Sequence, residues 1–285
     1  MSAAATRAAA LDEARGRLAL TAHQLNALAL AVRSEPPGSP QDKRAVAELR
    51  AGGVLDDENR VHPLAAQLAL AMTTPLIRML VETSGPQGTS AAHVVVAGEE
   101  VWYSEPWPGT DLDDQVIYQR AELPTIVWDL GRLAGLHRSQ VPEGASAFAA
   151  PIGLVDMVLE ASSLGPQEWV SARTVALATT VAQFPDLDVE TRHRWLSLVA
   201  TMRTWWRVTV SWGDEGAGTG RWLSVLDCGT EGYWRWDLPA DVDAPGDGTD
   251  RVTLTPVSGG ELWRSLQQLL PTSAELRAAV DARRR

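Results

Sequence analysis

The strongest constraint on the fold is an internal repeat, because two segments of similar pattern are expected to fold into two similar units. Over the first part of the unit, apolar residues meet apolar residues at a constant shift of 129 positions: Leu25 and Leu154, Val46 and Val175, Val81 and Val210. The shift then grows in small steps, so that Trp102 meets Trp234 and Trp128 meets Trp263. Steps that fall in turns are typical of loop insertions between two copies of one fold.

Each copy shows the same predicted order of elements: helices, then strands, then a closing helix. In copy one the pattern predicts helices over Leu25–Val32, Asp42–Arg50 and from Pro63, strands over Leu76–Glu82, His93–Ala97, Val101–Ser104 and Gln115–Gln119, and a helix over Pro124–Leu136. In copy two it predicts helices over Ile152–Ser162, Trp169–Ala182 and Glu190–Met202, strands over Trp206–Trp212, Arg221–Leu226, Tyr233–Trp236 and Arg251–Thr255, and a helix over Gly260–Leu270.

These elements predict one α+β fold. Alternation of apolar with polar residues in Trp206–Trp212 is typical of a half-buried antiparallel strand. Two half-sheets can join edge to edge, so we expect a central antiparallel sheet formed by two quasi-twofold-related repeats and flanked by helical bundles. The predicted divisions are an N-terminal helical or disordered extension (1–19), repeat one (20–141), repeat two (148–271) and a tail (272–285), with both repeats in one globular unit.

Composition narrows the possible functions. A net charge of −11 disfavours binding to nucleic acid or to an anionic membrane, because both need clustered Lys and Arg. The single cysteine, Cys228, excludes an internal disulfide and a Cys-based zinc cluster, and favours a reducing cytosol. Neither a signal peptide nor a membrane span is evident. We therefore expect a cytoplasmic protein without membrane insertion or bound nucleic acid.

The sequence shows none of the usual catalytic or metal-binding patterns. The five histidines are dispersed, and no pair has the short spacing that would place two imidazoles on one helix face. Gly213–Gly220 is flanked by predicted strands rather than by a strand and a helix, so it indicates a hairpin loop and not a phosphate site. The acidic segment Asp241–Asp250 does not have the spacing of an EF-hand calcium loop. The corresponding loop of copy one, Asp111–Asp114, is acidic as well, so an acidic loop tip is common to both copies. We predict no catalytic residue, cofactor or metal, with a non-metal enzyme as an alternative.

A second alternative comes from residues 42–70, which resemble the helix and wing of a DNA-binding winged helix. A recognition helix needs Lys and Arg to face phosphates, and the segment after Pro63 carries no charge until Arg78. A winged-helix-like DNA-binding or regulatory protein therefore stays as the weaker hypothesis.

Tryptophan is unusually abundant, with 12 residues in the chain, nine of them from Trp169 onward. Three of them have apolar counterparts in copy one and are expected in the core: Trp195, Trp206 and Trp263. Five others fit a core or a protein-binding face equally well: Trp107, Trp205, Trp222, Trp234 and Trp236.

Three segments carry a resemblance to a known family: Gly53–Pro63, Gly220–Leu223, and Tyr233–Asp237 followed by a closing helix. Together with the helix-rich start, they resemble the EspG family of actinobacterial chaperones of type VII (ESX) secretion, over about Leu20–Leu270. The resemblance implies a quasi-twofold central sheet flanked by helical bundles. It also implies a cytosolic protein that binds secreted PE–PPE pairs and covers an aggregation-prone helical tip.

By the same resemblance, the binding surface would combine sheet loops with the C-terminal bundle, here Trp107–Leu112 and Trp263–Leu269. The predicted partner is a secreted helical-hairpin protein, either PE/PPE-like or WXG100-like, and the chaperone would be a monomer or homodimer. The predicted protein-binding residues are Trp107, Leu112, Trp205, Trp222, Trp234, Trp236, Trp263, Leu266 and Leu269.

Overall fold

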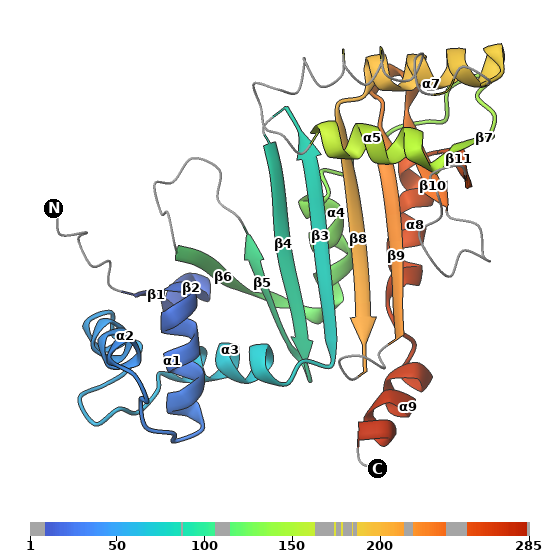
Figure 1. Ribbon diagram of the computed structural model, residues 1–285. Helices are drawn as coiled ribbons and strands as arrows, with labels where there is room; N and C mark the ends of the chain where they lie inside the picture. Colours follow the sequence, from blue (N-terminus) through green and yellow to red (C-terminus); the bar gives the residue numbers. More distant parts are fainter. Residues whose placement is uncertain are drawn as a thin grey trace, which may run out of the picture.

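The chain is organised around one large antiparallel sheet (Figure 1). The computed structural model describes residues 9–86, 88–105, 115–162, 174, 178, 184, 187–213, 219–237 and 250–283. Within this part of the chain the sheet has 11 strands, in the order β1-β2-β6-β5-β4-β3-β8-β9-β10-β11-β7. The predicted α+β class with a central antiparallel sheet is confirmed.

The strands fall into two sets that meet at one seam. The first set is β1 (Ala10–Asp12), β2 (Arg17–Thr21), β3 (Ile77–Gly85), β4 (Gly88–Ala97), β5 (Glu100–Glu105) and β6 (Gln115–Glu122). The second set is β7 (Phe148–Pro151), β8 (Thr204–Trp212), β9 (Thr219–Asp227), β10 (Tyr233–Asp237) and β11 (Arg251–Val257). Only β3 and β8 pair across the sets, from Ile77 opposite Trp212 to Ser84 opposite Trp205.

The strand order is the same on both sides of this seam. Outward from it run β3, β4, β5, β6 and β2 in the first set, and β8, β9, β10, β11 and β7 in the second. Because β3 and β8 are antiparallel, each set is related to the other by a quasi-twofold axis at the seam. This topology is the arrangement that the sequence repeat predicts.

Several helices begin where the sequence supplies a capping side chain. The described helices are α1 (Ala22–Val32), α2 (Pro40–Ala51), α3 (Pro63–Thr73), α4 (Ile126–Leu133), α5 (Ile152–Ser162), α7 (Val189–Thr201), α8 (Gly259–Leu269) and α9 (Ser273–Arg283). Reciprocal capping boxes start α1, α2 and α8, with Thr21, Ser39 and Ser258 as the capping residues. None of the helices in the described ranges is long and apolar enough to cross a membrane.

Three buried clusters hold the layers together. The central cluster packs α4, α8 and part of α9 against one face of β3, β4, β8 and β9. The opposite face carries two separate clusters, one under α1–α3 at the β2–β6–β5 end and one under α5 and α7 at the β10–β11 end. Figure 1 shows these two bundles at opposite ends of the sheet, with α4 and α8 behind it.

Two regions differ from the sequence-based expectation. Residues 10–19, part of the expected helical or disordered extension 1–19, contain β1 and most of β2, in which the alternate residues Leu18 and Leu20 are fully buried under α1–α3. Residues 273–283, expected as a tail, form α9, whose Leu276 and Ala279 pack on the central cluster. The predicted helix over Trp169–Ala182 lies outside the described residues, apart from positions 174 and 178.

Candidate protein-binding face

The sheet surface between the two end bundles carries side chains that belong to none of the three buried clusters. We call it the open face and define it by the outward side chains of the central strands: Arg78, Leu80, Glu82, His93, Arg207, Thr209, Ser211 and Trp222. All of them are partly or fully exposed. They alternate along each strand with residues of the central cluster, such as Met79 and Val208, which face α4 and α8.

Strand register places these side chains in rows across the sheet. Trp222 lies opposite Thr209, Thr209 opposite Leu80, and Leu80 opposite His93. This row crosses four strands and both repeats. Neighbouring side chains on one face of antiparallel strands lie within contact distance, so the row forms one continuous mixed surface.

Charge on the open face is centred on the seam. The Nε of Arg207 donates to Glu82 Oε2 at 2.8 Å, and its Nη2 lies 2.7 Å from the same oxygen. Arg78 lies on β3 as well, so arginine outnumbers carboxylate on this face although the chain carries a net charge of −11. The open face is therefore more positive than the rest of the molecule.

Trp222 is the exposed aromatic group of the open face. Its side chain is 40% exposed, and its ring lies 5.7 Å from the ring of buried Trp236, centroid to centroid. This contact fixes one side of the indole against the cluster under α5 and α7, so the other side faces solvent in a defined orientation. A rigid, half-exposed indole beside polar groups is typical of a protein-binding surface.

The predicted site residues that the structure describes do not gather on one surface. Trp205, Trp234 and Trp236 are buried in the cluster under α5 and α7, while Leu266 and Leu269 are buried in the central cluster. Trp263 is half-buried on α8, where its ring packs on Gly131. Of the nine predicted residues, Trp222 alone lies on the open face, and Trp107 and Leu112 lie outside the described residues.

The polar residues of the open face are not among the predicted site residues. The alternation in β3 and β8 marked Arg78, Glu82, Arg207 and Thr209 as outward residues of a half-buried strand. What the alternation did not give was the pairing of β3 with β8, which gathers these residues at the centre of the sheet. The available signal was the repeat itself, since edge-to-edge joining places the corresponding strands of the two copies side by side.

Two further features of the described residues concern small-molecule and metal binding. A cavity of about 430 Å³ lies between α1 and α2, but its polar groups are engaged locally: Arg50 donates to Asn59 Oδ1 and Arg60 pairs with Glu58. Among the described residues, no three His, Cys, Asp or Glu side chains gather closely enough to hold a metal ion.

Comparison with solved structures identifies a protein of the same architecture. The Mycobacterium tuberculosis type VII secretion system chaperone EspG5, solved in complex with a PE25–PPE41 dimer, aligns over 90% of this chain and 97% of its own, with a TM-score of 0.52. This chain has the EspG5 fold. Sequence identity with EspG5 is 13%, so the likeness concerns the fold, and at that level it confirms the predicted resemblance to the EspG family. No protein-family model and no curated protein sequence matches the chain.

Proposed function

We propose that this chain is a type VII secretion chaperone that binds a secreted helical protein through the open face. The observation that carries the proposal is the open face itself, an oriented and exposed Trp222 among charged and polar side chains on a sheet of the EspG5 fold. EspG5 is a chaperone in complex with a PE25–PPE41 dimer, so the proposed partner is a PE/PPE-like or WXG100-like helical pair.

The proposed mechanism is capping by mass action. An apolar side chain of the partner would cover the exposed side of Trp222, while polar groups around it would pair with Arg207, Glu82 and Thr209. Binding removes apolar partner surface from water, and the free partner concentration that feeds aggregation falls accordingly. The excess of arginine on the open face favours a partner segment that carries carboxylates. The chaperone would act in the cytoplasm, without a cofactor.

Co-purification with candidate substrates tests this proposal. The chain would be co-expressed with PE/PPE-like and WXG100-like pairs, and binding measured for the wild type, Trp222→Ala and Trp128→Ala. Trp128 is the matched control, because it is 59% exposed but lies on the outer side of α4, behind the sheet. Removing a central aromatic anchor typically costs about 2 kcal/mol or more, so Trp222→Ala should weaken binding about thirtyfold while Trp128→Ala binds normally.

Two outcomes would contradict the proposal. If none of the helical pairs is retained by the wild-type chain, the proposed partner class is wrong. If a pair is retained but Trp128→Ala weakens it while Trp222→Ala does not, binding occurs behind the sheet and the open face is not the site.

A further inference from the structure

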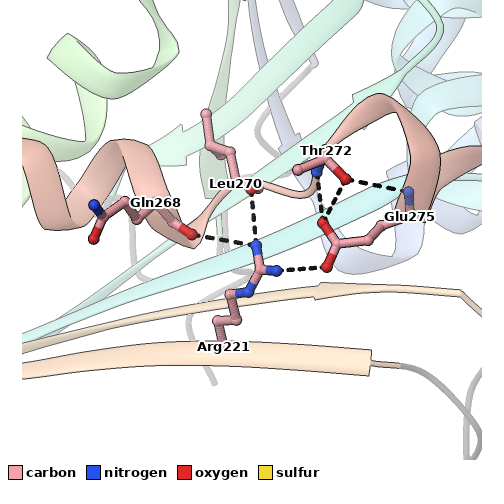
Figure 2. A network of polar contacts seen from close by, with 5 residues as sticks. All are labelled: Arg221, Gln268, Leu270, Thr272 and Glu275. Carbon is pink, nitrogen blue, oxygen red and sulfur yellow. Dashed lines mark hydrogen bonds and ion pairs between the residues drawn. The ribbon is translucent and has the colours of Figure 1, made fainter.

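Arg221 of β9 and Arg207 of β8 lie on opposite faces of the sheet and differ in the number of acceptors around them. The Nη1 of Arg221 donates to the backbone carbonyls of Gln268, at 3.2 Å, and Leu270, at 3.0 Å, where α8 ends. Its Nη2 donates to Glu275 Oε1 in the first turn of α9, as Figure 2 shows. Because three oxygens accept from its guanidinium, Arg221 is committed to holding the end of one helix and the start of the next.

Arg207, on the open face, has a single acceptor atom among the described residues. Its Nε and Nη2 both lie near Glu82 Oε2, at 2.8 Å and 2.7 Å, and its Nη1 donates to none of the described residues. The side chain of Arg207 is 44% exposed, compared with 24% for Glu82. A guanidinium carries several N–H donors in a planar fork, so Arg207 keeps donors for a second carboxylate that arrives from solvent.

Thr209, the next outward residue of β8 after Arg207, lies between two larger side chains. Trp222 lies opposite Thr209 on β9, and Leu80 lies opposite it on β3. Neighbouring strands are about 4.8 Å apart, so the backbones at Trp222 and Leu80 are about 10 Å apart across the threonine. All three side chains are partly or fully exposed. The surface is therefore lower at Thr209 than at the indole and the leucine that flank it.

We propose that the open face recognises a partner helix that lies along β8, with an apolar residue over Thr209 and a carboxylate, one helical turn away, over Arg207. The spacing supports this pairing, because Arg207 and Thr209 are about 7 Å apart along the strand and residues i and i+4 of a helix are about 6 Å apart along its axis. The apolar residue would be covered by Trp222 on one side and by Leu80 on the other. This inference rests on the proposed function and specifies the side chains by which the open face selects its partner.

The charges around Arg207 favour an acidic partner residue over a basic one. Glu82 Oε2 already accepts from two nitrogens of Arg207, and Glu82 is the less exposed member of the pair. Arg78 lies on the same face of β3 and adds positive charge. A carboxylate beside Arg207 is therefore attracted by two arginines and repelled by one partly covered carboxylate.

Three substitutions test this charge pattern on the full chain with any helical pair that the wild type retains. Arg207→Glu should weaken binding about tenfold, because it places like charges together. Glu82→Gln should tighten binding about threefold, because it removes the repulsion and leaves Arg207 in place. Arg264→Glu is the matched control, since Arg264 is an exposed arginine of α8 behind the sheet, and it should leave the affinity unchanged.

Two results with these variants would overturn the inference. If Glu82→Gln weakens binding, the partner pairs a basic residue with Glu82 and the carboxylate is wrong. If Arg207→Glu and Arg264→Glu weaken binding equally, only the net charge of the chain matters and Arg207 is not a specific contact. In either case the retained pair still supports the proposed function.

Synthetic peptides test the same pattern without a secreted partner. The probes are two helical peptides built from alanine and glutamine, each with one leucine and with one glutamate four positions before or four positions after it. The control peptides have glutamine in place of the glutamate, or the glutamate two positions from the leucine, where the two side chains point to different sides of the helix. Binding is followed by NMR through the indole N–H signal of Trp222, and Trp128, 59% exposed on α4 behind the sheet, is the internal reference.

At least one probe should shift the Trp222 signal at about fivefold lower concentration than either control, and Arg207→Glu should abolish this difference. The Trp128 signal should not move. Equal affinity of probes and controls, or a shift at Trp128 in place of Trp222, overturns the inference whether or not a secreted pair binds. A positive peptide result without any retained pair would instead contradict the proposed partner class alone.

Discussion

The two halves of the sheet share a strand order but not the chemistry of their cores. At one end, α1–α3 pack small aliphatic side chains, chiefly alanine and leucine, over β2 and β5. At the other end, α5 and α7 pack over four buried tryptophans: Trp195, Trp205, Trp234 and Trp236. At the repeat shift, fully buried Trp195 corresponds to Ala66. The two halves therefore share one topology, although the side chains that fill their cores differ in size.

A second contrast separates α4 from α8. Trp263 of α8 lies 3.0 Å from the position that a Cβ on Gly131 of α4 would occupy, so the glycine makes room for the indole. The residue of α8 that corresponds to Gly131 is Leu266, which is fully buried. Trp128, the counterpart of Trp263, meets no such gap and stays 59% exposed. One glycine therefore decides which of two equivalent tryptophans is covered.

The largest expected effect comes from making the second half resemble the first at position 195. Trp195→Ala should lower the free energy of unfolding by about 3–5 kcal/mol, because it leaves a large cavity between α7 and the sheet. Urea unfolding followed by fluorescence and by far-UV circular dichroism would measure it, with exposed Trp128→Ala as the near-neutral control. Because the central cluster contains residues of both halves, both probes should report a single transition. Separate transitions would show that the halves unfold independently.

Alkaline pH should also distinguish the halves. Tyr233 is 1% exposed, and burial raises its pKa from 10.0 to about 12; the aligned residue of the first half is Val101. Because the folded-state pKa is raised, this contribution to stability is fully present below pH 10 and is lost as pH rises toward 12. The loss should approach about 2–3 kcal/mol above that range and be absent in Tyr233→Phe. Chemical unfolding at a series of pH values checks this, and an unchanged slope in the variant would contradict it.

A substitution at Gly259 tests the contact between α8 and the segment His137–Ser139, which lies at the end of the first repeat. A Cβ at Gly259 would lie 2.6 Å from the His137 carbonyl oxygen, and the Gly259 N–H donates to the Ser139 carbonyl at 3.0 Å. Gly259→Ala should therefore cost about 1–3 kcal/mol in thermal or urea unfolding. Gly260→Ala is the matched control, because its nearest neighbour is Ser258 Oγ at 4.0 Å, and it should be neutral or slightly stabilising. Equal effects of the two substitutions would argue against this contact.

The smallest expected effect separates two neighbouring tryptophans of β10. Trp234 Nε1 donates to the Glu231 carbonyl at 2.8 Å, whereas Trp236 Nε1 is buried without a partner among the described residues. Trp234→Phe and Trp236→Phe remove similar volume, but the first also breaks a hydrogen bond. Trp234→Phe should therefore cost about 1 kcal/mol more than Trp236→Phe in urea unfolding. The reverse order would mean that packing, and not the hydrogen bond, dominates at Trp234.

Local patterns predicted those parts of the fold whose determinants are local. Alternation located β3 and β8 within a few residues, and apolar spacing located α5 and α8. Segment β2 was missed because its five residues pair with β6, about a hundred positions away. Helix α9 was missed because the residue that holds it, Arg221, lies on β9.

The candidate site was harder to predict for a related reason. Alternation shows that Trp205 and Trp206 face opposite sides of β8, but not which side a helix covers. Trp205, Trp234 and Trp236 are buried because α5 and α7 pack over their end of the sheet. Trp222 lies on the same side and stays exposed, because it lies opposite Thr209, farther along β9 from Leu226, whose end of the strand packs under α5 and α7 with Trp205. Only the tertiary arrangement distinguishes these indoles.

The pairing of β3 with β8 affects how the protein folds during translation. While the chain is being translated, β3 can pair with β4 at once, but its other edge finds β8 only after the second copy has left the ribosome. At roughly 5–20 residues per second, that edge stays bare for on the order of ten seconds. A bare strand edge invites pairing with other nascent chains on the same message. A protein proposed to shield others from aggregation thus passes through an unshielded stage of its own.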